Sequence, residues 1–277
     1  MIQDLGNSIF DNQYKNYIVR PNDKLIICAN RSVMLKQKDG IISFPSYKEI
    51  KQCNETRYLF SINETRYFMA TNVVGLDEKY KFENVECFRT ALPKEERFAG
   101  ITGYQLYMWY DSTRFCSRCG SLLVHSEKER MLECPECKKM NYPTISPAVI
   151  VGIVNGDKIL MTKYQGREYK NYALVAGFTE IGETLEQTVK REVMEEVDLK
   201  VKNIRYYDCQ PWSFSNTMLI GFFCDLEGED KIKIDEEELS CGLWVKCSEM
   251  EDILDDDITL TRKMMMEFKN NPQKFGK

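Results

Sequence analysis

Short apolar runs separated by turn residues fill roughly the first 92 residues of the chain. The runs KLIICA, SVML, IISF, YLFSI and RYFMA alternate with polar or glycine-containing segments, which is typical of β-strands joined in hairpins. The next stretch, PKEERFAGITGYQLYMWY, predicts a helix, because Pro93 suits a first helical turn. Residues 1–110 are therefore predicted to form a β-rich N-terminal domain with a connecting helix.

Strand and helix patterns alternate over residues 143–277. AVIVGIV and KILMTKY flank Asn-Gly-Asp, which predicts a hairpin with a type I′ turn, and YALVAG, NTMLIGFFCDLE, KIKI and GLWVK predict further strands. TLEQ at 184–187 has the pattern of a capping box, and Val189, Val193 and Val197 follow as the apolar stripe of a helix. TLTRKMMMEFKNN predicts a closing helix with its methionines in the core.

Composition sets limits on the class of protein. The 277 residues are 43% hydrophobic and 29% charged, which suits one large or two medium globular domains. No apolar run reaches the ~18 residues of a membrane span, so no membrane partner is predicted. The N-terminal residues lack a secretory signal pattern. A net charge of −5 argues against a generally basic nucleic-acid surface, although a local basic groove stays open.

The chain has eleven cysteines and one histidine. An odd number, most of them scattered singly, does not resemble a disulfide framework and favours a reducing, cytoplasmic location. Seven are predicted to act as small buried hydrophobes: Cys28, Cys53, Cys87, Cys209, Cys224, Cys241 and Cys247.

The other four cysteines, Cys116, Cys119, Cys134 and Cys137, form two C-x2-C pairs fourteen residues apart. Two such pairs supply four thiolates, the ligand set of a closed structural Zn²⁺ site. A single iron of rubredoxin type is the alternative, and a redox dithiol is disfavoured because it needs only one pair. Residues 111–142 are therefore predicted to form a zinc ribbon, and His125 is expected to be an ordinary surface histidine. Basic and acidic residues are interleaved there, so no basic footprint is evident.

Three glutamates, Glu192, Glu195 and Glu196, crowd the segment REVMEEVDL at 191–199. Their spacing places them on one helical face, where each like-charge pair costs about 0.2–0.5 kcal/mol. A solvated acidic face is the simplest interpretation. However, the glutamates lie beside the predicted valine stripe, at the edge of buried surface, where clustered charge is costlier.

Residues 177–199, GFTEIGETLEQTVKREVMEEVDL, resemble the Nudix box. The matching residues are Gly177, Glu183, Arg191, Glu192, Val193, Glu195, Glu196 and Leu199. Asp198 stands where the family usually has a glycine that ends the helix, so we expect a shifted helix cap and retained activity.

The resemblance implies a C-terminal Nudix α/β/α sandwich that binds Mg²⁺ or Mn²⁺ and uses Glu192, Glu195 and Glu196 in catalysis. Hard divalent cations require oxygen ligands, and they neutralise a diphosphate and activate water. Glu183 and Arg191 are implied to support the loop and helix. A carbonyl near Ala176 and the more distant Glu238 are implied as further metal ligands.

A second segment, CQPWSFSNT at 209–217, resembles the SQPWPFPxS array of the NAD(H) pyrophosphatase branch of that family. Cys209 replaces a serine, and Ser213 and Ser215 replace prolines. The resemblance implies a substrate-binding segment made of Gln210, Pro211, Trp212, Ser213, Phe214, Ser215, Asn216 and Thr217. Core packing is the alternative for Trp212 and Phe214.

Three further substrate contacts follow from the same resemblance. Phe178 and Tyr142 correspond to an aromatic pair that stacks on a base, with the tyrosine donated by the partner subunit of a homodimer. Glu129 corresponds to a substrate-contacting glutamate.

The predicted fold class is α+β: a β-rich N-terminal domain, a zinc ribbon and a Nudix domain. The predicted reaction is metal-dependent hydrolysis of the diphosphate of NAD(H) to AMP and nicotinamide mononucleotide, with NAD-capped RNA as a further substrate. Two alternatives stay open. One is a Nudix pyrophosphatase for ADP-ribose or dinucleoside polyphosphates, and the other is a non-catalytic zinc-ribbon adaptor that senses nucleotides.

Overall fold

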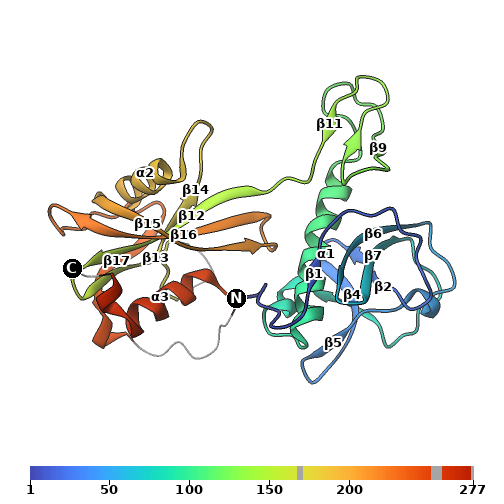
Figure 1. Ribbon diagram of the computed structural model, residues 1–277, viewed down its shortest axis with the longest axis horizontal. Helices are drawn as coiled ribbons and strands as arrows, with labels where there is room; N and C mark the ends of the chain where they lie inside the picture. Colours follow the sequence, from blue (N-terminus) through green and yellow to red (C-terminus); the bar gives the residue numbers. More distant parts are fainter. Residues whose placement is uncertain (167–170, 251–257, 276–277) are drawn as a thin grey trace. The chain divides into compact units, whose positions relative to one another are not determined.

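The computed structural model of the chain separates into two compact units (Figure 1). One unit runs from Ile2 to Thr144 and also includes Ser213–Asn216, and the other comprises Met1 and the rest of residues 145–277. The structure describes residues 1–166, 171–250 and 258–275. Within these ranges, no helix has the length and apolar character needed to span a membrane.

The N-terminal part is built from short strands, as predicted. One sheet has the strand order β1 (Phe10–Asp11), β6 (Glu55–Ile62), β7 (Thr65–Thr71) and β2 (Lys24–Ile26). A second sheet joins β3 (Cys28–Ala29), β4 (Ser32–Lys38) and β5 (Ile41–Ser43), and β8 (Lys81–Asn84) pairs with β4. Two 3₁₀ turns are also present, η1 (Tyr47–Glu49) and η2 (Val85–Arg89).

Helix α1 (Lys94–Ser112) begins directly after Pro93 and leads into the ribbon, which confirms the predicted connecting helix. Its buried face includes Phe98, Ile101 and Leu106. The ribbon is a small antiparallel sheet at the C-terminal end of α1 (Figure 1). Its strands are β9 (Val124–His125), β10 (Leu132–Glu133) and β11 (Met140–Asn141).

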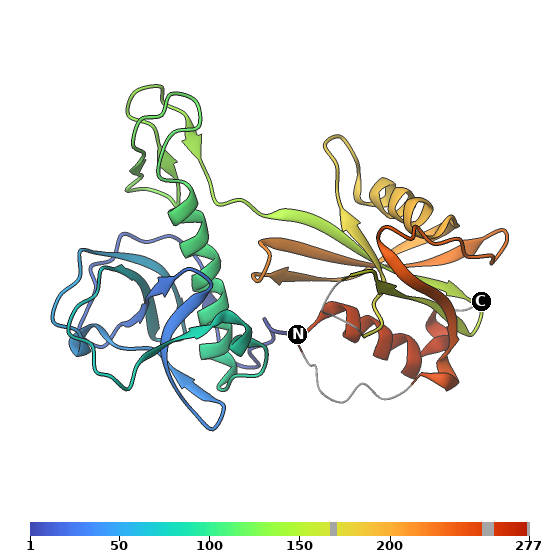
Figure 2. The ribbon, with the colours of Figure 1, turned by 180° about the vertical axis from the view of Figure 1, so that it is seen from behind.

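The second unit is a mixed sheet between two helices. The strand order is β15 (Lys200–Trp212), β16 (Thr217–Glu227), β12 (Ser146–Asn155), β13 (Lys158–Tyr164) and β17 (Leu239–Lys246), and β14 (Val175–Phe178) also pairs with β12. Helix α2 (Leu185–Val197) covers one face and α3 (Leu260–Asn270) the other (Figures 1 and 2). The 3₁₀ turns η3 (Cys247–Glu249) and η4 (Pro272–Lys274) flank α3 along the chain. The predicted α/β/α sandwich is confirmed.

Strands β12 and β13 form the predicted hairpin, but the predicted type I′ turn is wrong. Asn155 pairs with Lys158, so Gly156 and Asp157 are the two turn residues. Gly156 has a φ of 62°, whereas Asp157 is not among the residues with positive φ. Positive φ at the first turn position alone is the type II′ arrangement, in which glycine is preferred.

The start and core face of α2 follow the sequence pattern. The Thr184 hydroxyl accepts a hydrogen bond from the Gln187 N–H at 3.3 Å, and the Gln187 side chain accepts one from the Thr184 N–H at 2.7 Å. This is the predicted capping box. Val189, Val193 and Val197 are fully buried against the sheet.

The end of α2 differs from expectation. Asp198 itself takes the left-handed conformation, with φ 56° and ψ 39°, and its N–H donates to the Met194 carbonyl at 3.1 Å. The expected shift of the helix cap is therefore wrong, because aspartate tolerates this conformation where the family has glycine.

The segment KIKI was predicted as a strand, and that prediction is wrong. Lys233 and Asp235 donate their N–H groups to the carbonyls of Val197 and Glu196 at 3.1 and 2.9 Å. The segment therefore binds the last turn of α2 instead of a neighbouring strand. Its alternating apolar residues, Ile232 and Ile234, still pack against the core.

Candidate active site and cysteine cluster

The three glutamates of the predicted active site all lie on α2, but in different environments. Glu196 is 2% exposed and Glu192 is 8% exposed, whereas the side chain of Glu195 is 58% exposed. The interpretation of these glutamates as a solvated acidic face is therefore wrong for Glu192 and Glu196. Burial of carboxylates is costly unless other groups compensate their charge.

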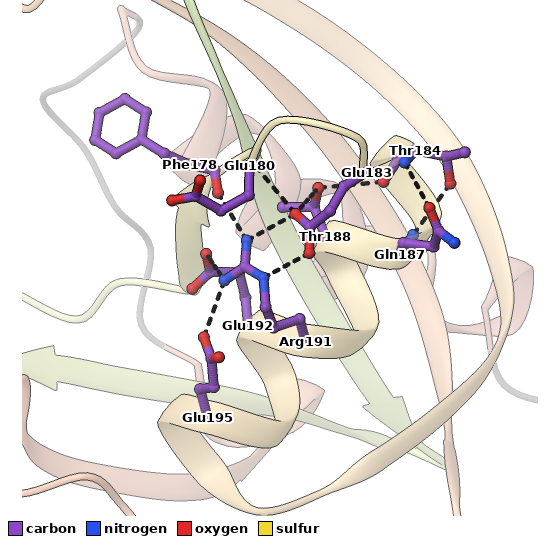
Figure 3. A network of polar contacts seen from close by, with 9 residues as sticks. All are labelled: Phe178, Glu180, Glu183, Thr184, Gln187, Thr188, Arg191, Glu192 and Glu195. Atoms are coloured by element: carbon purple, nitrogen blue, oxygen red, sulfur yellow. Dashed lines mark hydrogen bonds and ion pairs between the residues drawn. The ribbon is translucent and has the colours of Figure 1, made fainter.

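Arg191 supplies compensating charge at the centre of the group (Figure 3). Its Nε and Nη2 donate to the two oxygens of Glu183 at 2.6 and 2.9 Å. Its Nη1 donates to Glu192 at 2.7 Å and to Glu195 at 2.9 Å, and Nη2 also donates to the Phe178 carbonyl at 2.9 Å. One guanidinium thus joins the helix, the preceding loop and strand β14.

Glu183 is held from further directions. It accepts hydrogen bonds from the Glu180 N–H at 3.1 Å and from the Thr188 hydroxyl at 3.0 Å. The hydrogen bond from Arg191 is the main reason that the pKa of Glu183 is lowered to about 2, and the Glu180 N–H adds to it. Glu183 is therefore a permanently charged anchor, which fits the supporting role expected for it.

The pKa of Glu192 shifts in the opposite direction. Burial raises it, Arg191 lowers it, and the nearby carboxylates of Glu195 and Glu238 raise it again. The influence of Glu238 is informative, because this residue lies just before β17, more than forty positions along the chain. The fold therefore brings Glu238 close enough to Glu192 for their charges to interact, and its role as a metal ligand stays a prediction.

Gly177 explains how Glu192 approaches the sheet. A Cβ atom placed on Gly177 would lie 2.0 Å from Glu192 Cδ and 2.1 Å from both carboxylate oxygens. The carboxylate therefore occupies the space that any other residue at position 177 would fill. The neighbouring Ala176, expected to offer its carbonyl to a metal, lies in the same strand, β14.

The cysteine cluster is arranged as a metal site. Its four sulfur atoms lie within 4.8 Å of one another, with 3.5 Å between Cys116 and Cys137 and 3.4 Å between Cys119 and Cys134. Tetrahedral ligands at about 2.3 Å from zinc are separated by about 3.8 Å, so four thiolates fit structural Zn²⁺ with small adjustments. Over the described parts of the chain, no cysteine takes part in a disulfide. Of the seven cysteines predicted to be small buried hydrophobes, Cys224 alone is buried and the other six are half-buried, so that prediction is wrong for those six.

The glutamates of α2 are not gathered in this way. Within the ranges that the structure describes, the cysteines are the one group of three or more potential ligand side chains that lie close enough together to hold a metal ion. Glu192 and Glu195 instead both face Arg191. Their hard oxygen donors suit a divalent cation, and Glu195 is exposed enough to turn towards one.

His125 is not the ordinary surface histidine that was expected. Its Nε2 lies 2.9 Å from the Tyr110 hydroxyl, and its ring stacks on Tyr14 with 5.3 Å between centroids. Burial lowers the pKa of His125. The residue therefore packs the ribbon against helix α1 and the N-terminal segment, and it lies outside the cysteine cluster.

The predicted substrate segment forms the β15–β16 hairpin, in which Trp212 pairs with Thr217 and residues 213–216 make the turn. Gln210 has another use. Its side-chain oxygen accepts from the Leu260 N–H at 2.7 Å and its amide donates to the Ile258 carbonyl at 2.5 Å. The prediction that Gln210 contacts substrate directly is therefore wrong, because its fully buried amide holds the start of α3.

The remaining predicted substrate contacts lie on separate units. Phe178 ends β14 with 55% of its surface exposed. Tyr142 and Glu129 lie in the other unit, where the tyrosine hydroxyl donates to Glu129 at 3.3 Å. The pairing of Phe178 with Tyr142 stays a prediction.

Sequence reasoning missed two contributors to the site. Thr188 fixes Glu183 with its hydroxyl, and the Phe178 carbonyl accepts from Arg191. Thr188 is completely buried one helical turn before Arg191. The signal available in the sequence was a hydroxyl residue three positions before the arginine on a predicted helix, a spacing that places both on one face. The backbone carbonyl left no signal in the sequence.

Two family models match the chain. One, described as the NUDIX domain, matches residues 144–268, and the other, described as the NADH pyrophosphatase zinc ribbon domain, matches residues 111–142. The Nitrosomonas europaea NUDIX hydrolase crystal structure has a TM-score of 0.50 and 22% identity, and it covers 59% of this chain and 94% of that one. At this identity the likeness shows the fold alone.

Curated relatives agree with the family models. A protein from Pectobacterium atrosepticum named "NAD-capped RNA hydrolase NudC" is 43% identical over 148 residues, which are 53% of this chain and 56% of that protein. A protein of the same name from Actinobacillus succinogenes is 36% identical over 181 residues, 63% of this chain and 68% of that protein. The chain thus spans a little over half the length of most of these relatives.

Proposed function

This chain belongs to the Nudix family, in the branch that carries the NADH pyrophosphatase zinc ribbon, and from this premise we propose that it hydrolyses the diphosphate of NAD(H). The products are AMP and nicotinamide mononucleotide, and NAD caps on RNA 5′ ends are a further substrate. The names of the relatives support this substrate class. The three glutamates of the predicted active site are all present on α2, which speaks against a non-catalytic adaptor.

The single observation that carries the proposal is the charge arrangement around Arg191. One guanidinium orients the carboxylates of Glu183, Glu192 and Glu195, while Glu196 is buried on the same helix. A protein that only binds nucleotides has no need to bury carboxylates at this cost. Several carboxylates held around one guanidinium supply oxygen ligands for the divalent cations that a reaction at an anionic diphosphate requires.

The donor set fits Mg²⁺ or Mn²⁺. The candidate ligands are hard oxygens: the Ala176 carbonyl and the carboxylates of Glu192, Glu195, Glu196 and Glu238. When bound, such a cation neutralises diphosphate charge and lowers the pKa of a water molecule. The protein's own residues hold the carboxylates, with Glu183 and Arg191 fixing the loop and Gly177 leaving room for Glu192.

The deciding experiment compares substrates. Purified protein with Mg²⁺ or Mn²⁺ is given NADH, NAD⁺, ADP-ribose, diadenosine polyphosphates and NAD-capped RNA, and the products are separated by chromatography. We expect AMP and nicotinamide mononucleotide from NADH. Much higher activity on ADP-ribose or diadenosine polyphosphates than on NADH would overturn the substrate assignment.

The β15–β16 hairpin can be tested for nicotinamide recognition through Trp212. An aromatic contact with a base contributes about 1–3 kcal/mol where stacking has been measured on nucleic acids, so its loss should lower kcat/KM by about tenfold or more. Trp212→Ala should therefore affect NADH more strongly than ADP-ribose, which lacks nicotinamide. An equal loss on both substrates with a lower melting temperature would show that Trp212 only packs the fold.

We further propose a homodimer formed with the help of the ribbon. Val124 and Met140 both pair with Glu133 from opposite sides, so their side chains stand on one face, and Tyr142 follows two residues later. About half the surface of each apolar side chain is exposed. Sedimentation equilibrium should show a dimer that Val124→Glu weakens, and a wild-type monomer at micromolar concentration would exclude it.

The free cysteines also support a cytoplasmic location, because thiols persist in a reducing compartment. Fractionation of cells that produce the protein tests this location directly.

A further inference from the structure

A cavity of about 680 Å³ lies within the Ile2–Thr144 unit, and none of its lining residues is one assigned above to the active site. Three parts of that unit form its walls. The N-terminal sheets and the segment after β7 supply Met69 and Val73, helix α1 supplies Tyr107, and the ribbon supplies Leu122 and Leu123. Its volume lies in the range of small-molecule sites, which is roughly 300–1,000 Å³.

Flat side chains line this cavity. Phe82 is 47% exposed, Tyr107 is half-buried, and the Arg57 guanidinium lies over the ring of Tyr110 with 4.6 Å to its centroid. Glu55 also pairs with Arg57 and so fixes the guanidinium plane. Nucleobases stack on aromatic rings and on guanidinium planes, so these surfaces suit a planar heterocycle.

Charged groups of both signs lie beside the aromatic surfaces. Asp111 is exposed and lies one helical turn after Tyr107. The pKa of Tyr107 is raised mainly by burial and next by the carboxylate charge of Asp111, so the two side chains are close. Arg114, three residues further along the chain, also lines the cavity and is exposed. Carboxylates bind ribose hydroxyls, and arginine binds phosphate.

We propose that this cavity binds a ribonucleotide. The base stacks on Tyr107 and Phe82, the ribose hydroxyls bind Asp111, and the phosphate binds Arg114. Two ligands carry these groups and are the two possible sources of the bound nucleotide: a free mononucleotide such as AMP, and a nucleotide within the RNA chain that follows an NAD cap. The site goes beyond the proposed function, because none of the residues that line the cavity is a catalytic carboxylate or a predicted substrate contact, and only the RNA source rests on that function.

Photo-crosslinking locates the site. The full-length zinc-loaded protein is irradiated with 8-azido-AMP, and labelled peptides are mapped by mass spectrometry. We expect label in residues 105–114 or 76–82, reduced about tenfold in Arg114→Ala and in Tyr107→Leu. Arg118→Ala is the matched control, because Arg118 is an exposed ribbon arginine that does not line the cavity. Label confined to residues 145–277, or label in the cavity that neither variant reduces, overturns the proposal.

Competition then identifies the source. Excess AMP should displace the label if the ligand is a free nucleotide, and a single-stranded oligoribonucleotide with a 5′-hydroxyl should displace it if the ligand is RNA. The oligodeoxyribonucleotide of the same sequence should compete less well, because it lacks the 2′-hydroxyl that Asp111 recognises. Failure of both AMP and the oligoribonucleotide to compete means that the label is adventitious, and the proposal is then wrong.

Kinetics separate this site from the proposed hydrolysis. For an RNA source, Arg114→Ala should raise KM for NAD-capped RNA about tenfold and leave kcat/KM for free NADH unchanged, whereas Arg118→Ala should change neither. If Arg114→Ala changes KM for neither substrate, RNA is excluded as the ligand. The competition with AMP then decides whether the ligand is a free nucleotide. Failure of the wild-type protein to hydrolyse NADH would contradict the proposed function. It would not affect the crosslinking test of the cavity, which is independent of hydrolysis.

Discussion

Replacement of Gly177 by alanine tests whether close approach of strand β14 to helix α2 positions the active-site carboxylate. The added Cβ would lie 2.0 Å from Glu192 Cδ, and ordinary contact begins at 3.4 Å. The carboxylate must therefore move by about 1.4 Å, the difference between these distances. Gly177 does not have a positive φ, so alanine fits the backbone there, and the flexible end of Glu192 can move without unfolding.

The expected effect is large for activity and small for stability. Functional groups are held within about 0.5 Å of their working positions, and a displacement of about 1 Å can cost about a hundredfold in rate. We expect kcat/KM for NADH to fall at least about a hundredfold, with a weaker apparent affinity for Mg²⁺ or Mn²⁺. Melting temperature and far-ultraviolet circular dichroism should stay close to wild type.

A double variant gives the control. Glu192→Asp shortens the side chain by one methylene, about 1.5 Å, and makes room for the alanine Cβ. Gly177→Ala should then cost far less in the Glu192→Asp background than alone, because the two changes act on one contact. Near-wild-type activity of Gly177→Ala, or losses that multiply in the double variant, would refute the steric reasoning.

Three further variants test other parts of the protein. Cys134→Ser should release zinc and destabilise the ribbon without directly altering hydrolysis, as measured by elemental analysis and melting; wild-type protein that contains only iron would contradict the zinc assignment. Glu196→Gln should keep the fold and reduce turnover by orders of magnitude, and near-wild-type turnover at saturating Mg²⁺ would remove Glu196 from the catalytic group. Glu96 has its pKa raised from 4.5 to about 7, chiefly by burial, so its contribution to stability is complete below about pH 4.5 and is lost as pH rises through 7. Melting temperature should therefore fall less between pH 5 and 8 in Glu96→Gln than in wild type, and parallel profiles would exclude this role.

Local contacts explain why so much of the second unit could be predicted from sequence. The capping box of α2 and the β12–β13 hairpin depend on residues within a few positions of one another. Long-range contacts explain the failures. Gln210 binds the backbone of Leu260, fifty positions away, and His125 packs on Tyr14, 111 positions away. No pattern in either segment reports these partners.

Arg191 gives a second reason that the crowded carboxylates of α2 are tolerated. The resemblance implied these carboxylates as metal ligands and Arg191 as a support of the loop and helix. In the structure, Arg191 donates to Glu183, Glu192 and Glu195 at once, so one guanidinium offsets much of the repulsion without any metal. A divalent cation that binds Glu192 and Glu195 must therefore share these carboxylates with Arg191. The arginine sets the charge that such a cation encounters, as well as the position of its ligands.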